Sequence, residues 1–212
     1  RAWSMSTGNF QGPVHLNWPF REPLEPSENL VAPEPTLTVA RQHEVKYLED
    51  PVLADLAERY ERGLITVGPN NLPMDEFDSL LAFSANNGWP ILADPCSQIR
   101  GIENQKNAPI ITSYEILFSS DQFVSLLPSV DVIVHVGLPA TSKSYRLWKQ
   151  KNPPSRYVLV SPGVDWPDPS HEATDVVNSS MLNSFPYSTL GRGLDTDWCQ
   201  LWINHDNLAV ET

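Results

Sequence analysis

The sequence is poor in cysteine and contains no long apolar run. Its two cysteines, Cys96 and Cys199, form neither a metal-ligand spacing nor a disulfide framework, which favours a reducing cytosol. No segment reaches the roughly 20 consecutive apolar residues that a membrane-spanning helix needs. The first residues, beginning at Arg1, include neither an initiator Met nor a signal-peptide core, so we expect a piece of a longer chain.

Positive charge is also scarce. Lys and Arg number 14 against 26 Asp and Glu residues, which gives a formal net charge of -12. A surface this acidic repels phosphate groups. We therefore expect neither nucleic acid nor an anionic membrane as a partner.

The glycine-rich fingerprint of dinucleotide-binding proteins is missing as well. The first strand-to-helix turn, residues 67–73, has one glycine where the fingerprint has three, and its two prolines remove amide donors for phosphate. The five histidines stand at no metal-ligand spacing, and no Ser-His-Asp order is visible. Residue chemistry alone predicts no catalytic, cofactor-binding or metal-binding residue.

What is present is a regular alternation of strands and helices. Short apolar runs of four to six residues alternate with helical patterns between residues 50 and 180, which indicates right-handed crossovers and a parallel sheet covered on both faces. We predict the α/β class, with a Rossmann-like doubly wound parallel sheet of about five or six strands. The expected strands are 64–68, 89–93, 131–137, 156–160 and 174–177, and the expected helices are 51–62, 75–87, 113–118, 121–127 and 141–151.

The N-terminal part has a different character. Residues 13–17 read as a short strand, for which residues 1–11 supply no pairing partner. A connector with four prolines follows over residues 21–39, where helix is disfavoured. The strand is therefore expected to belong to a sheet whose other strands lie outside this chain.

Basic residues gather in one stretch, residues 143–156, which holds five of the fourteen. Lys143, Arg146 and Lys149 fall on one face of the expected helix. Such a face suits an anionic ligand, although cations near a helix C-terminus also complement its dipole. Lys143 lies near the helix start, where the dipole disfavours a cation, which favours a functional role for it. Asp94 ends a strand where such sheets place ligands, but it serves equally well as a turn former.

The segment Gly12–Leu24, GPVHLNWPFREPL, carries a more specific signal. It resembles the end of the pyrimidine-binding domain in thiamine-diphosphate enzymes, and in particular the family of 2-succinyl-5-enolpyruvyl-6-hydroxy-3-cyclohexene-1-carboxylate synthases of menaquinone and phylloquinone biosynthesis. Further agreements lie at residues 62–68, 88–94, 97–98, 136–137, 143 and 168–171.

The resemblance implies a domain division. Residues 1–24 would be the C-terminal tail of the pyrimidine-binding domain, 25–49 a Pro-rich linker, 50–190 the central Rossmann-like domain and 191–212 the start of the connection to the diphosphate-binding domain. The catalytic glutamate and the diphosphate site would lie in the other domains. The fragment alone is therefore expected to be inactive and to hold no cofactor or metal.

The resemblance also implies a function for the intact enzyme. Thiamine diphosphate and Mg²⁺ would support decarboxylation of 2-oxoglutarate and addition of the succinyl semialdehyde unit to isochorismate. Lys143 matches the lysine of a lysine-arginine pair that contributes to substrate binding in the family. Ser144 stands where the arginine is expected, and Arg146 is the candidate replacement. A homodimer or homotetramer is expected, in the cytoplasm or, in a photosynthetic eukaryote, in a plastid.

Two alternatives stay open at this point. The chain would be a stand-alone Rossmann-type anion-binding or regulatory module, or the FAD-binding central domain of an enzyme like acetolactate synthase.

Overall fold

The computed structural model describes residues 6, 12–19, 22, 51–70, 77–102, 107–161, 167–178, 185–186, 191, 193–194 and 196–210. The chain divides into two units, Arg1–Lys46 and Tyr47–Thr212. The expected connector at 21–39 lies almost entirely outside the described residues. The second unit holds the sheet.

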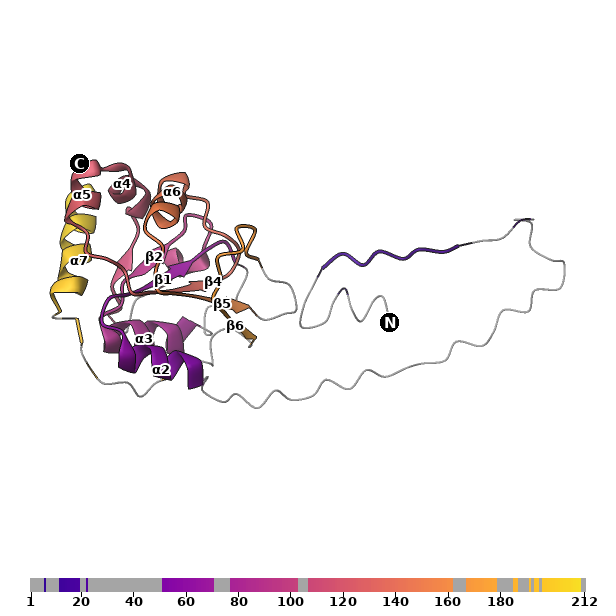
Figure 1. Cartoon of the computed structure of the whole chain (residues 1–212), viewed down its shortest axis with the longest axis horizontal. Helices are drawn as coiled ribbons and strands as arrows, with labels where there is room; N and C mark the ends of the chain where they lie inside the picture. The colour runs from indigo at the N-terminus through magenta and orange to yellow at the C-terminus, as the bar shows by residue number, and fades with distance from the viewer. Residues whose placement is uncertain are drawn as a thin grey trace. The chain divides into compact units, whose positions relative to one another are not determined.

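The second unit is built on six parallel strands. They are β1 (Gly63–Val67), β2 (Ile91–Ala93), β3 (Ile110–Ile111), β4 (Val132–Val136), β5 (Arg156–Ser161) and β6 (Asp175–Asn178), in the order β3-β2-β1-β4-β5-β6 (Figure 1). The chain starts in the middle of the sheet, builds outward to β3, and then crosses back to β4. This confirms the predicted Rossmann-like class, with a switch point between β1 and β4.

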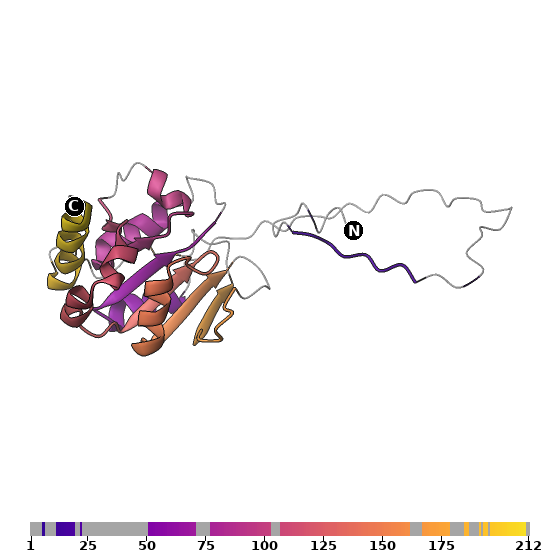
Figure 2. The same ribbon diagram turned by 90° about the horizontal axis from the view of Figure 1, so that it is seen from above.

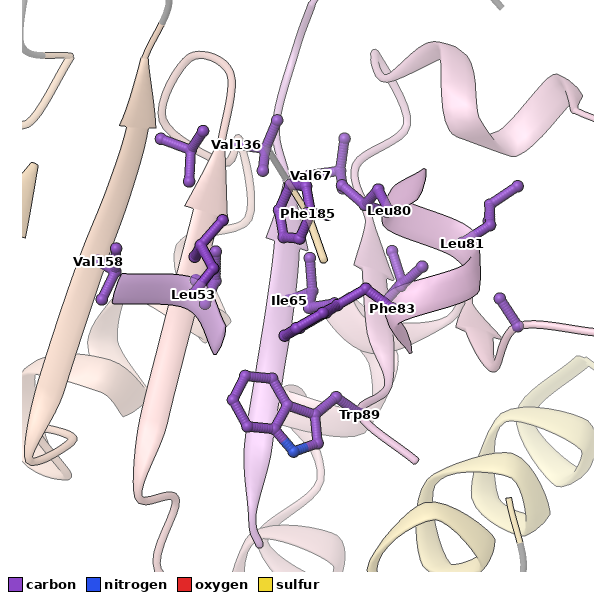
Figure 3. Close-up of a cluster of buried hydrophobic side chains, with 14 of the residues drawn as sticks. Leu53, Ile65, Val67, Leu80, Leu81, Phe83, Trp89, Val136, Val158 and Phe185 are labelled. Carbon is purple, nitrogen blue, oxygen red and sulfur yellow. The ribbon is translucent and has the colours of Figure 1, made fainter. Parts of the chain in front are cut away.

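One face of the sheet is covered by α2 (Pro51–Arg59) and α3 (Asp78–Asn87). Alternate strand residues point to this side because side chains along a strand alternate between faces. Phe83, Trp89 and Phe185 pack together over β1, as Figure 3 shows. The fully buried members of this cluster include Leu53, Leu56, Ile65, Val67, Leu80, Ala93, Val134, Val136, Val158 and Val160. Helices were expected at 51–62 and 75–87, and α2 and α3 lie within these ranges.

The opposite face is covered by α4 (Tyr114–Ser119), α5 (Asp121–Leu126), α6 (Lys143–Lys151) and α7 (Asp197–Val210). Phe118 lies at the centre of an aromatic cluster, with its ring centroid 4.6 Å from that of Trp148 and 5.7 Å from that of Trp202. Helix α7 packs against α4 and the edge strand β3, at the end of the sheet away from β6 (Figure 2). Two layers of helices therefore enclose the sheet.

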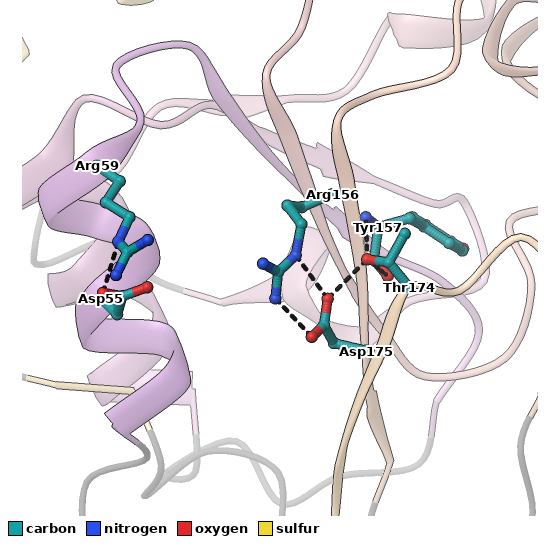
Figure 4. A network of polar contacts seen from close by, with 6 residues as sticks. All are labelled: Asp55, Arg59, Arg156, Tyr157, Thr174 and Asp175. Atoms are coloured by element: carbon teal, nitrogen blue, oxygen red, sulfur yellow. Dashed lines mark hydrogen bonds and ion pairs between the residues drawn. The ribbon is translucent and has the colours of Figure 1, made fainter.

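Charged pairs tie neighbouring strands at their amino ends. Arg156 at the start of β5 donates two hydrogen bonds to Asp175 on β6, and Thr174 bonds the same carboxylate (Figure 4). The Asp55–Arg59 pair in the same view lies on exposed α2, where such pairs add little stability.

Three elements had no counterpart among the expected ones. The unexpected elements are β3, a 3₁₀ turn at Gln98–Gly101 and helix α7. Residues 13–17, which were expected to form a strand, lie in a described segment, 12–19, that has no strand. A strand's amide and carbonyl groups need a neighbour, and the expected neighbours lie outside this chain, so the expectation stays a prediction.

Candidate functional site

The carboxyl ends of β1 and β4, where a doubly wound sheet places its ligand, are joined by main-chain hydrogen bonds. Gly68 N donates to Val136 O at 2.9 Å, and Leu138 N donates to Pro69 O at 2.9 Å. A Cβ on Gly68 would lie 1.8 Å from Leu138 O, so the two loops approach as closely as only glycine allows. Gly137, with φ of +87°, makes the turn on the other side. The described parts of these loops bind each other rather than presenting free amides to a pyrophosphate.

Helix α6 begins beside this switch point. Ser142 is its N-cap and accepts a hydrogen bond from Tyr145 N at 3.0 Å. Lys143 is the first helical residue and is exposed. Among the described residues, its ammonium group forms no ion pair or hydrogen bond. It is therefore a cation without a partner in the described part of the chain, at the edge of the sheet where the carboxyl ends of the strands lie.

Ser144 has a different role from the arginine expected in its place. Its hydroxyl donates to Glu115 Oε1 at 2.9 Å, and the hydroxyl of Ser142 donates to Glu115 Oε2. The two serines thus bind the start of α6 to helix α4. Ser144 supplies no positive charge, and a substrate anion would meet Lys143 without the second member of the pair.

Asp94 ends β2 and is fully buried. Its carboxylate accepts hydrogen bonds from Cys96 N at 2.9 Å, Tyr114 Oη at 3.0 Å, and both Thr141 N and Thr141 Oγ1, at 2.7 and 2.8 Å. Burial alone would raise the pKa of Asp94, but these donors outweigh it and hold the pKa below its usual value. Of the two roles considered for Asp94, the turn-forming one is observed, extended by a link to the loop before α6.

A cleft of about 260 Å³ lies on the other side of α6, away from α4. Arg146 lines it from the helix, together with His135, Tyr157 and residues 139–140 and 167–170. Arg146 is exposed and forms no ion pair within the described part of the chain. Lys149 also lines the cleft, but it is buried and paired with Glu172 at 2.6 Å, with its ammonium group 3.9 Å from the centre of the Tyr157 ring.

His135, the penultimate residue of β4, also lines this cleft. Its Nε2 donates to Leu138 O at 3.0 Å, while Nδ1 has no hydrogen-bond partner among the described residues. Burial, helped by the nearby charge of Lys149, lowers the pKa of His135 to about 4. The ring is therefore neutral at pH 7 and offers Nδ1 as an acceptor.

The two site residues expected from the sequence are thus separated. Lys143 lies at the open edge of the sheet and Arg146 lines the cleft on the flank of α6, so the structure does not bring them into one pocket. Substrate binding by either residue stays a prediction. The anchoring roles of Glu115 and Asp94 were missed, because each depends on partners 20 to 47 positions away in the chain.

The described residues bring no three His, Cys, Asp or Glu side chains together in a way that would hold a metal ion. Nor do any of the described helices combine the length and apolarity needed to cross a bilayer.

Comparison with known proteins connects this geometry to a family. A family model described as the middle domain of thiamine pyrophosphate matches residues 34–208. The 2-succinyl-5-enolpyruvyl-6-hydroxy-3-cyclohexene-1-carboxylate synthase of Haloquadratum walsbyi is 32% identical over 228 residues, which cover 100% of this chain and 36% of the relative. The synthases of the same name from Listeria monocytogenes serotype 4b and Staphylococcus epidermidis (strain ATCC 35984) are 28% and 29% identical, over 100% and 95% of this chain.

This chain spans 34 to 37% of the length of these three curated relatives. The family model covers the whole six-stranded sheet and nearly all of α7. The sheet has Rossmann-like order, and the described parts of its switch-point loops bind each other. The chain belongs to the family of middle domains of thiamine pyrophosphate enzymes.

Proposed function

We propose that this chain is the central domain of a thiamine-diphosphate-dependent synthase that decarboxylates 2-oxoglutarate and adds the succinyl semialdehyde unit to isochorismate. The observation that carries the proposal is the similarity of the whole chain to synthases of that name, in Haloquadratum walsbyi, Listeria and Staphylococcus. Both substrates are carboxylates, and an exposed Lys143 at the ligand-bearing edge of the sheet suits them.

No residue of this chain is assigned to thiamine diphosphate or to Mg²⁺. When bound, the cofactor supplies the electron sink for decarboxylation, and the protein's contribution is binding, orientation and charge. In the proposal, Lys143 contributes charge by attracting a substrate carboxylate. Arg146 is the second candidate, acting from the cleft on the flank of α6.

The proposal extends to the assembled enzyme. It is a homodimer or homotetramer, and it works in the cytoplasm or, in a photosynthetic eukaryote, in a plastid. The acidic surface, with a net charge of -12, supports small-molecule substrates over nucleic acid as its partners.

Of the alternatives, the FAD-binding domain has the least support. The loops after β1 and β4 bond each other where a dinucleotide's pyrophosphate would sit. A flavin absorption band near 450 nm in the purified protein would revive it.

The test uses the full-length protein that contains this chain. We expect it to release CO₂ from 2-oxoglutarate and to consume isochorismate only when thiamine diphosphate and Mg²⁺ are present. Lack of turnover with this substrate pair, in a folded full-length protein, would disprove the proposed reaction.

A second measurement addresses the site residues. Lys143→Ala is expected to raise the KM for one carboxylate substrate roughly tenfold or more, because a hydrogen bond to a charged group contributes about 1.5–3 kcal/mol. Arg146→Ala tests the cleft in the same assay. Lys151→Ala, at the exposed C-terminal end of the same helix, is the matched control and should leave KM unchanged.

A further inference from the structure

The segment that carries Lys143 is held by side chains from two distant elements. Asp94, at the end of β2, accepts hydrogen bonds from both the backbone and the side chain of Thr141. Glu115, on α4, accepts from the hydroxyls of Ser142 and Ser144, the residues on either side of Lys143. Three residues of a four-residue segment are therefore anchored through their side chains.

Of the two anchors, Asp94 is buried and resists displacement, whereas Glu115 is exposed. Asp94 is fully buried, so a lost hydrogen bond at its carboxylate would not be replaced readily by water. The Asp94 carboxylate is itself fixed by Cys96 N and by the hydroxyl of Tyr114. The carboxylate of Glu115 faces the N-terminus of α6, where the helix dipole favours a negative charge.

The next turn of α6 is held as well. The hydroxyl of Tyr145 lies 3.0 Å from Thr66 Oγ1 on β1, in the buried layer between helix and sheet. The helix start is thus tied to β1, which borders the switch point, to the residue after β2, and to α4. Lys143 alone in the segment is left without a partner among the described residues.

Lys143 thus combines an ammonium group that is unpaired within the described part of the chain with an ordered main chain, and this combination is expected for a residue that binds a ligand. Because the main chain on both sides is already ordered, the conformational cost to the protein of binding a carboxylate is limited to the lysine side chain. If the segment were loose, the same contact would also have to order the backbone, and the substrate would bind more weakly.

We propose that Asp94, with Glu115 as second anchor, is a positioning residue that sets where Lys143 stands for a substrate carboxylate. The inference rests on the proposed function and assigns Asp94 no contact with substrate. A purely stabilising role for Asp94 is the competing interpretation, and kinetics separate the two.

The experiment is a double-mutant cycle in the full-length enzyme with Asp94→Asn, Lys143→Ala and the double variant. If Asp94 acts through Lys143, Asp94→Asn raises the KM for the same substrate as Lys143→Ala, by roughly 3- to 10-fold, and adds little in the Lys143→Ala background. Asp175→Asn, which breaks a comparable carboxylate pair at the far edge of the sheet, is the control and should leave KM unchanged.

Milder variants keep the test valid if Asp94→Asn does not fold. Thr141→Val removes one of the bonds to Asp94 and should show the same non-additive rise in KM. Thr141→Ser keeps both donors and should restore the wild-type value.

The outcomes are distinguishable. Fold-changes that multiply in the double variant overturn the positioning role while leaving the proposed reaction intact. An unchanged KM in Lys143→Ala overturns both the role of Lys143 and this inference, again with an active wild type. An inactive wild type shows instead that the proposed function itself is wrong, and the inference falls with it.

Discussion

Gly68→Ala is expected to destabilise the fold, because there is no room for a methyl group at this position. The new Cβ would lie 1.8 Å from Leu138 O and 3.0 Å from the carbon of that carbonyl. Both are backbone atoms, so the clash cannot be relieved by rotating a side chain. The loop after β4 would have to move away from the loop after β1.

That movement has a definite cost. Leu138 N donates to Pro69 O, and Leu138 O accepts from His135 Nε2, so displacing residue 138 strains both bonds. Overpacking costs roughly 1–3 kcal/mol, and a lost hydrogen bond about 1 kcal/mol. We therefore expect the free energy of unfolding to fall by about 2–4 kcal/mol.

Urea unfolding measures this difference. With a slope of about 2 kcal/mol per M, the midpoint should fall by roughly 1–2 M. Gly101→Ala is the matched control, because a Cβ at Gly101 meets no atom within 4 Å. If the two variants unfold within about 0.5 kcal/mol of each other, the two loops are not in the close contact described.

Three further predictions concern the opposite face of the sheet. Burial lowers the pKa of His135 to about 4, so between pH 6.5 and pH 4 the unfolded chain binds a proton at this residue and the folded chain does not. The free energy of unfolding should therefore fall by up to about 3 kcal/mol over this pH range. In His135→Gln, the urea midpoint should depend less on pH between these two values. Glu172→Gln leaves the buried ammonium group of Lys149 without its carboxylate and should lower the free energy of unfolding by about 3 kcal/mol, measured by heat or urea. Lys149→Met keeps the apolar part of the side chain and should lower it less. Equal losses in the two variants would contradict the buried ion pair. Trp198→Phe removes the 2.9 Å bond from the indole Nε1 to Gly63 O and should lower stability by about 1–2 kcal/mol, whereas no loss would mean that α7 is not docked at the start of β1.

The sheet was predictable because its strands are short, apolar and evenly spaced. Strand β4, with all five residues buried, reads as one continuous apolar run apart from His135. Parallel strands that are covered on both faces give such continuous apolar runs. In the helices between them, apolar residues recur with the period of an α-helix. Strand β3 was not predicted, because its two residues are too few to show a periodic pattern of apolar side chains.

Helix α7 was not anticipated because its pattern is ambiguous. Trp198 and Trp202 face the core, but Asp206, one turn further, is also buried. Its carboxylate accepts hydrogen bonds from the backbone amides of Thr112 and Ser113. A carboxylate in the inward position weakens the apolar stripe on which helix prediction depends. Its partner lies more than 90 residues away, and no local pattern reports it.

The candidate site was predictable only in part. The position of Lys143 at the helix start indicated a role, since a cation there works against the helix dipole. The separation of Lys143 from Arg146 was not visible, because a spacing of three residues gives only a rough common face. In the fold, the neighbouring Lys149 is buried and forms an ion pair with Glu172, whereas Lys143 and Arg146 are exposed. The three basic residues therefore have different surroundings.

The two thiols differ in a way that suits spectroscopy. Cys199, on α7, is buried, whereas Cys96 is exposed. The backbone amide of Cys96 donates a hydrogen bond to the carboxylate of Asp94. A maleimide dye would therefore attach at a single place without any cysteine being engineered away. The attached fluorophore would sit two residues from the carboxylate that binds the loop before α6, so its emission would report whether that loop stays as ordered in solution as the hydrogen bonds of Asp94 imply.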